Sequence, residues 1–228
     1  MRTNTRKACV YYMRSMGVAT LWFLGIYALV MAVLYPLIVI DVFDLFGRDT
    51  ASPIRLSETV ASASSIYLLV TGIVMPSYLE TALSFGLTRR QNACALLLVS
   101  ALLAFGLTLV SELVALVFAE PANFLWSIQA FLHGWFFYLI GWLIVIGYQY
   151  RRIIGALLTT ALGVGLFFSL LAFTPSWSFV LGETSVLNSI SEGALVSLLF
   201  LFSPFSLLAC LALALVIVLL TRRIPIKV

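Results

Sequence analysis

Long stretches without charged side chains restrict what this sequence can fold into. A helix needs about 20 mostly apolar residues to cross the hydrocarbon of a membrane. Six stretches of this kind occur in the 228 residues, and within them only Glu112 is charged at neutral pH. They are Met16–Ile40, Thr59–Leu79, Gln91–Ala119, Pro121–Tyr150, Ile153–Thr174 and Gly193–Thr221. The runs are continuous and rich in Leu, Ala and Phe, which favours membrane helices over a membrane barrel of alternating strands.

The composition excludes the common soluble classes of protein. Hydrophobic residues make up 63% of the chain and charged residues 10%, whereas a soluble domain has roughly 45–50% and about 25%. Such a chain cannot cover a globule with polar surface, so soluble enzymes and nucleic-acid binders are excluded despite the net charge of +4. Three cysteines and one histidine are too few for a disulfide scaffold or a zinc site. We expect an all-α polytopic membrane protein.

Basic residues indicate the orientation of the spans, because Lys and Arg concentrate on the cytoplasmic side of a membrane. If six helices are drawn with the N- and C-termini cytoplasmic, only Arg48 and Arg55 of the 13 basic residues lie outside. Among the acidic residues of the connections, Glu80 alone lies inside. The sequence therefore predicts six transmembrane helices with both termini cytoplasmic. The excess positive charge is attributed to topology and anionic lipid rather than to nucleic acid.

The chain is expected to form one transmembrane domain, residues 1–228. Its parts are an N-terminal segment (1–15), a six-helix bundle (16–221) and a cytoplasmic tail (222–228). The N-terminal segment mixes four basic residues with apolar ones, which fits either an amphipathic helix in the membrane interface or a frayed basic tail. Pro204 is expected to break the last span into an outer half-helix and a full span.

Sequence motifs for several kinds of chemistry are absent. There is no GxxxxGK[ST] phosphate loop, so ATP is not bound by that route. There is also no HExxH or GxSxG pattern, which removes two routes to hydrolysis within the membrane. No catalytic, cofactor-binding or metal-binding residues are therefore predicted. A membrane protein without them is expected to move a molecule, sense a signal or anchor a partner.

The connection between the second and third spans is the most informative stretch. Pro76 should end or bend the second span, and residues 77–85 have the pattern of a short amphipathic helix. Gly86 suits a helix end that needs positive φ, and Arg89 and Arg90 would reach lipid phosphates. Two interpretations stay open: a surface helix that docks on a partner, or an ordinary inner loop with an arginine pair.

The string ALSFGLTRRQ, residues 82–91, resembles a sequence motif of small six-helix permease subunits of bacterial ABC transporters. These subunits belong to the type V exporter group. The resemblance implies an N-terminal interfacial helix, short outer half-helices between the last two spans, and a coupling helix in this connection. It also implies that ATP and Mg are bound by separate cytoplasmic ATPase subunits, and that a second permease, identical or similar, completes a dimer. The implied location is the bacterial cytoplasmic membrane, and the implied substrate is a peptide, drug or lipid-like molecule.

The resemblance assigns the coupling contact to a few residues. Phe85 would be its apolar anchor and Glu80 a charged partner for the ATPase. The other residues assigned to this contact are Ser84, Gly86, Arg89 and Arg90. In this interpretation the chain is a transport subunit and not itself an enzyme. Two alternatives remain: an enzyme within the membrane, or a sensor or scaffold that transports nothing.

Polar residues inside the spans are the candidates for that enzyme. If the third and fourth spans form a hairpin centred near residue 122.5, Glu112 and His133 lie at equal depth and can pair. Gln129 falls on the same helix face as His133. This group is either a polar patch in a translocation path or a structural clasp between helices. On the second span, small residues share one face and predict close helix packing; they are Ser57, Ala61, Ser64, Ser65 and Gly72.

Overall fold

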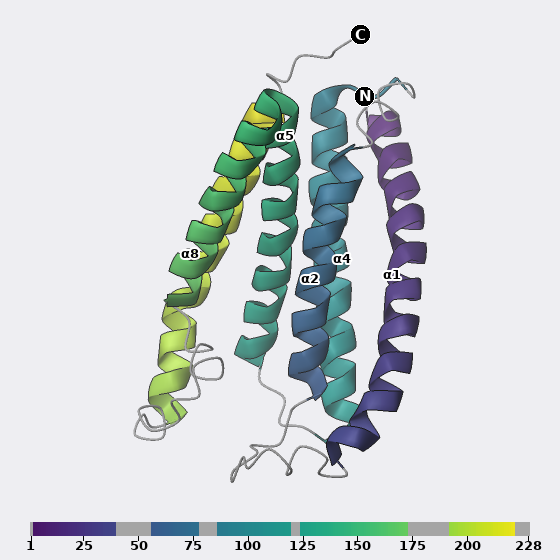
Figure 1. The fold of residues 1–228 in the computed structure, drawn as a ribbon, viewed down its shortest axis with the longest axis vertical. Coiled ribbons are helices and arrows are strands. Elements are labelled where there is room, and N and C mark those ends of the chain that lie inside the picture. The colour runs from purple at the N-terminus through teal and green to yellow at the C-terminus, as the bar shows by residue number, and fades with distance from the viewer. Residues whose placement is uncertain (1, 40–55, 78–85, 120–123, 173–191, 222–228) are drawn as a thin grey trace.

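The computed structural model describes residues 2–39, 56–77, 86–119, 124–172 and 192–221 (Figure 1). Within these ranges the chain forms helices joined by turns and contains no strand, which confirms the all-α class for the described residues. The helices are α1 (Arg2–Val39), α2 (Leu56–Ser77), α4 (Arg89–Val117), α5 (Phe124–Ala172) and α8 (Glu192–Thr221).

Helix α1 is continuous from Arg2 to Val39. The frayed tail expected as one alternative for residues 1–15 is therefore wrong, and no break separates this segment from the span that follows. The reason lies in its packing, because one side of the first four turns is buried. Ala8, Tyr12 and Met16 recur at intervals of four and are 4%, 3% and 0% exposed. This stripe packs against α4, the helix that α1 contacts most.

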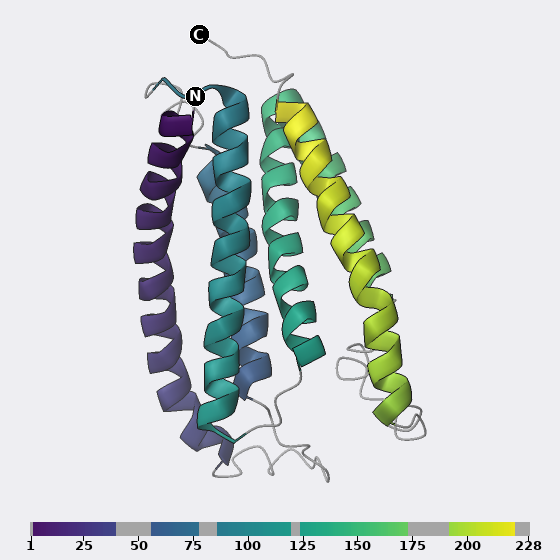
Figure 2. The same cartoon turned by 180° about the vertical axis from the view of Figure 1, so that it is seen from behind.

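Helix α5 folds back on itself. A Cβ added at Gly147 would lie 2.3 Å from Oγ1 of Thr159, and one added at Gly163 would lie 2.8 Å from the side chain of Ile140. A straight helix would hold Ile140 and Gly163 about 35 Å apart, at about 1.5 Å per residue. Two antiparallel limbs result, with their reversal at the end of the bundle where α1 begins (Figures 1 and 2).

The most extensive helix contact joins α2 to α5. A Cβ added at Gly72 would lie 2.2 Å from the carbonyl oxygen of Tyr138, and one added at Gly141 would lie 2.3 Å from the carbonyl oxygen of Leu69. Only glycine lets two backbones approach this closely. The close packing predicted for the small residues of the second span is confirmed at Gly72, and α5 contributes a matching glycine.

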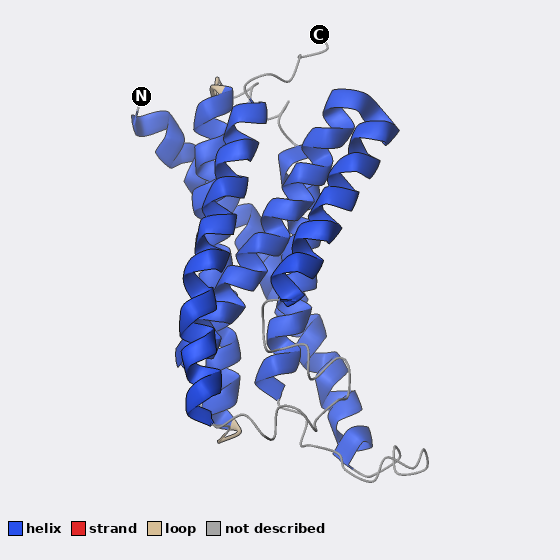
Figure 3. Cartoon of the chain, turned by 90° about the vertical axis from the view of Figure 1, so that its left-hand side faces the viewer, coloured by secondary structure: helices blue, strands red, loops and turns tan. Residues whose placement is uncertain are grey.

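Four helical segments of the described chain are long and apolar enough to cross a membrane, so the protein has the character of a multi-pass membrane protein. They are Thr5–Val33, Leu56–Pro76, Arg89–Val117 and Trp126–Gln149. Ser206–Thr221 is a shorter apolar helix. The expected break at Pro204 is wrong, because α8 continues through it. The starts of α1 and α4 and the end of α8 lie at one end of the bundle, and all helices run roughly along its long axis (Figure 3).

Candidate functional site

The connection between α2 and α4 carries most of the predicted site. Glu80, Ser84 and Phe85 lie outside the described residues, as does the helix predicted over 77–85 apart from Ser77, the last residue of α2. Helix α2 ends one residue after Pro76, as expected from the proline. Gly86 has a φ of 74°, which confirms the positive φ predicted there. Gly86 is exposed, and its missing Cβ faces open space.

A capping box fixes the start of α4. Oγ1 of Thr88 accepts a hydrogen bond of 3.3 Å from the backbone N–H of Gln91, and Oε1 of Gln91 accepts one of 3.0 Å from the N–H of Thr88. This reciprocal pair satisfies two of the donors that a helix start leaves open. Arg89 and Arg90 therefore occupy the first turn, where the helix dipole disfavours cations. Their presence has to be explained by an external anion or by topology, not by helix stability.

Helix α4 is bonded to three other helices through polar side chains. Asn92 accepts from the hydroxyl of Tyr12 in α1 at 2.5 Å. The hydroxyl of Ser100 accepts from the indole N–H of Trp135 in α5 at 3.1 Å. The hydroxyl of Ser111 donates to the backbone carbonyl of Ser57 in α2 at 2.8 Å. These bonds were not predicted, because single Ser and Asn residues in apolar runs give no pairing signal.

Glu112 lies opposite Ser127. Its Oε1 accepts a hydrogen bond of 2.5 Å from the Ser127 hydroxyl. Ser127 comes six residues before His133, about 9 Å along a helix axis, so the predicted equal depth of Glu112 and His133 is wrong. Helix α4 ends at Val117, followed by Ala119 with a φ of 53°. The hairpin is therefore not centred at residue 122.5, and residues of α4 lie beside earlier residues of α5 than the sequence predicted.

The other two predicted intramembrane residues have different surroundings. His133 is half-buried, and its ring lies 5.9 Å from the ring of Phe137. Gln129 is 6% exposed, and its Oε1 has no hydrogen-bond partner among the described residues. The structure therefore does not gather Glu112 and His133 into the compact acid–base pair that an enzyme reading needs.

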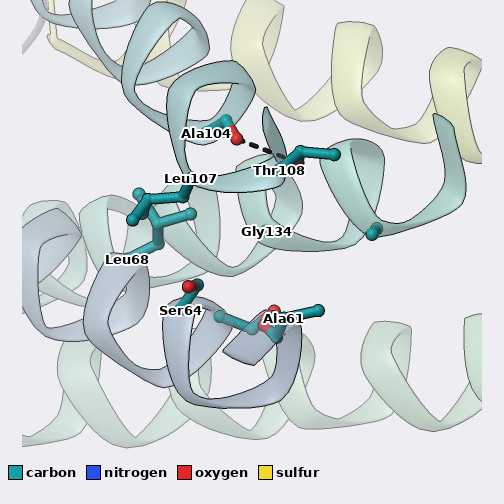
Figure 4. A pocket seen from close by; sticks show the side chains of 9 residues that line it. Ala61, Ser64, Leu68, Ala104, Leu107, Thr108 and Gly134 are labelled. Atoms are coloured by element: carbon teal, nitrogen blue, oxygen red, sulfur yellow. Dashed lines mark hydrogen bonds between the residues drawn. The ribbon is translucent and has the colours of Figure 1, made fainter. Parts of the chain in front are cut away.

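A small cavity lies between α2, α4 and α5 (Figure 4). The Oγ of Ser64 is buried there without a partner among the described residues. Two other hydroxyls line the cavity, and each donates to its own helix: Thr108 to Ala104 and Ser65 to Ala61, both at 3.0 Å. The space is about that of one water molecule, which a polar cavity of this kind can hold. In this conformation it does not admit a larger ligand.

No protein family, curated protein or solved structure matches the chain. The residues and the geometry described above therefore carry the functional argument, and the general statement they support is that of a multi-pass helical membrane protein.

Proposed function

We propose that the chain is a transmembrane permease subunit of an ATP-driven ABC exporter in the bacterial cytoplasmic membrane. It would form the substrate pathway with a second permease, identical or similar, and would couple to a separate ATPase that binds ATP and Mg. The observation that carries the proposal is the junction at residues 86–92. There, the end of the ALSFGLTRRQ string coincides with a positive-φ glycine and a capped helix start.

The proposed topology has six spans with both termini cytoplasmic. Support comes from the fold-back of α5, which divides it into two antiparallel limbs, and from the shared end at which α1 begins and α8 finishes. Charge supports the same arrangement. The cations of the described helices lie at that end, in the first four turns of α1, the first turn of α4 and the reversal of α5; they are Arg2, Arg6, Lys7, Arg14, Arg89, Arg90, Arg151 and Arg152. The acidic residues of the described chain lie toward the other end, at the start of α2, the end of α4 and the start of α8; they are Glu58, Glu112 and Glu192.

Force applied at the connection between α2 and α4 would reach the whole bundle through α4. The capping box makes the first turn of α4 rigid. Asn92, Ser100 and Ser111 then tie that helix to α1, α5 and α2 in turn. Closure of the ATPases would push on the coupling helix, and a shift of α4 would change three interfaces at once. This is how ATP hydrolysis in another chain would move helices that bind no nucleotide.

Substitutions in the connection test the proposal. Phe85→Ala should weaken binding of the proposed partner ATPase, because truncating an aromatic anchor buried in an interface commonly removes about 2 kcal/mol of interface energy. Glu80→Lys should do the same by reversing a charge in the contact. The matched control is Phe105→Ala, which truncates a half-exposed phenylalanine in the middle of α4, whose ring contacts Phe131 of α5 and not the connection.

The measurements are co-purification with the ATPase, and ATP hydrolysis and transport in vesicles. We expect the two connection variants to insert normally, lose the ATPase and stop transport, with the control unchanged. Normal assembly and transport by both variants would remove the coupling role. An activity of the isolated chain that disappears in Glu112→Gln would instead establish the enzyme reading.

A further inference from the structure

One side of the N-terminal turns of α1 combines exposed cations with exposed apolar side chains. Val10 and Tyr11 are 61% and 54% exposed, and the cations around them are also exposed. Because residues four and seven apart share a helix face, Tyr11 lies between Lys7 and Arg14. We call this surface the basic face of α1; it consists of Arg6, Lys7, Val10, Tyr11 and Arg14.

The rest of the described protein leaves the basic face uncovered and its charge unneutralised. Tyr12, whose hydroxyl bonds to Asn92 of α4, lies on the opposite side of α1, so α4 does not cover the basic face. Among the described residues, no acidic side chain lies at this end of the bundle. Within the same part of the chain, Arg6, Lys7 and Arg14 form no ion pair. The result is a concentrated positive charge that the described protein does not neutralise.

The length of α1 places this surface at the membrane boundary. Its 38 residues span about 57 Å at 1.5 Å per residue, whereas the hydrocarbon is about 30 Å thick. The uncharged part from Met16 onward is long enough to cross by itself. The residues just before Met16 therefore lie at the level of the lipid headgroups, where Lys, Arg and Tyr are favoured.

The same face continues into the apolar surface of α1. Val18, Leu21 and Trp22 follow Arg14 at helical spacing and are 52%, 71% and 70% exposed. A phospholipid lying along the helix would place its phosphate among the cations and its acyl chains on these side chains. An acidic protein would meet the cations but not this continuous apolar stripe.

We propose that the basic face of α1 binds the phosphate of an anionic phospholipid in the adjacent leaflet. Lys7 and Arg14 flank the headgroup, Tyr11 lies against the glycerol region, and Val18 and Trp22 contact an acyl chain. Nonspecific electrostatic attraction to anionic lipids explains an excess of cations at this end of the bundle. It does not require those cations to share a helix face with exposed apolar residues. The proposal does not depend on the transport function.

The test measures lipid retention by the full chain. Protein in detergent is mixed with equal amounts of phosphatidylglycerol and phosphatidylcholine, and native mass spectrometry counts the lipids that stay bound. We expect phosphatidylglycerol to be retained preferentially. Each cation near a membrane surface contributes about fivefold to anionic lipid affinity, so Lys7→Gln/Arg14→Gln should lower phosphatidylglycerol affinity by about 25-fold.

Two variants make the test specific. Arg151→Gln/Arg152→Gln removes two cations from the reversal of α5, which is at the same end of the bundle, and should lower the affinity by less than about twofold, well under the fivefold expected for one cation of the site. Lys7→Arg/Arg14→Lys keeps the charges and should keep the preference. Raising the salt should weaken binding, because exposed charges are screened.

Four results would overturn the proposal. The first is equal retention of the two lipids by the wild-type chain. The second is equal loss in the two double Gln variants, which would mean a general charge effect. Displacement of the lipid by millimolar inorganic phosphate would show a site for free phosphate. Unchanged lipid retention with loss of ATPase binding in Lys7→Gln/Arg14→Gln would show a protein interface.

Discussion

The hydroxyl of Tyr12 in α1 donates a hydrogen bond to the side-chain oxygen of Asn92, 80 residues later, in the first full turn of α4. Both residues are buried, with exposures of 3% and 2%. No water competes for these groups, so separating them would leave two polar atoms unsatisfied. The pair therefore fixes the register of α1 on α4 beside the connection that follows α2.

Removing this hydroxyl should destabilise the bundle. Tyr12→Phe deletes the donor and keeps the ring, and hydrogen bonds between membrane helices contribute about 0.6 kcal/mol on average and up to about 1.7 kcal/mol. We expect a loss in this range in the free energy of unfolding, measured by denaturant titration in mixed micelles. Tyr27→Phe is the control, because the Tyr27 hydroxyl has no hydrogen bond within the described chain and its stacking on Phe23 is kept. Equal effects of the two substitutions would show that the bond does not stabilise the bundle.

Adding one methyl group between α2 and α5 should be costly. In Gly72→Ala the new Cβ would lie 2.2 Å from the backbone oxygen of Tyr138, and overpacking of this kind costs about 1–3 kcal/mol. Thermal unfolding in detergent would show a lower midpoint. Gly25→Ala, on α1, meets nothing within 4 Å and should leave the midpoint unchanged or raise it. A tolerated Gly72→Ala would mean that the two backbones are further apart than described.

The register of α4 on α5 can be tested by comparing the coupling energies of residue pairs on the two helices. Glu112 bonds to Ser127, so a double-mutant cycle of Glu112→Ala with Ser127→Ala should give about 0.6–1.7 kcal/mol. The cycle of Glu112→Ala with His133→Ala should give a smaller value, because His133 lies about 9 Å further along the helix. Unfolding titrations of the six chains supply both values. A larger coupling energy with His133 would instead support the equal depth of Glu112 and His133 that was expected from the sequence.

The proposed topology predicts which sites react from outside. In a chain whose three cysteines are replaced by alanine, single cysteines at Asp49 and Ser185 should react with an impermeant maleimide added to intact cells. Cysteines at Arg90 and Lys227 should react only after the membrane is opened. Outside labelling at residue 90 would contradict an inner connection there and would also remove the coupling role.

The helical class and the positions of the apolar runs were predictable, because both depend on properties of single residues. The length of an uncharged stretch shows directly whether a helix of that sequence can cross the membrane. The fold-back of α5 also falls where Arg151 and Arg152 interrupt the apolar sequence. The continuity of α1 was harder to predict, since it depends on the burial of Ala8 and Tyr12 against a helix far away in the sequence.

The candidate site was predictable only where the backbone geometry depends on residues that are neighbours in the sequence. The positive φ of Gly86 was expected for a glycine at a helix end, and the Thr88–Gln91 box is visible as a T-x-x-Q pattern. The partner of Glu112 was not predictable in this way. Its depth relative to α5 depends on where α4 ends and on the stagger of two helices, and a one-turn error exchanges His133 for a different neighbour. The proline after Glu120 favoured an earlier helix end.

The contacts of Gly72 and Gly141 also limit how the molecule can move. With carbonyl oxygens this close to glycine Cα atoms on both sides, α2 and α5 cannot slide along each other without backbone collision. Packed interfaces of this kind shift between discrete arrangements rather than deform continuously. The two helices should therefore move as one rigid body. Any flexibility of the bundle has to come from helix interfaces that are held by side chains alone. Under the proposed transport function, movement would therefore come from α1, α4 and α8 around a stiff centre formed by α2 and α5.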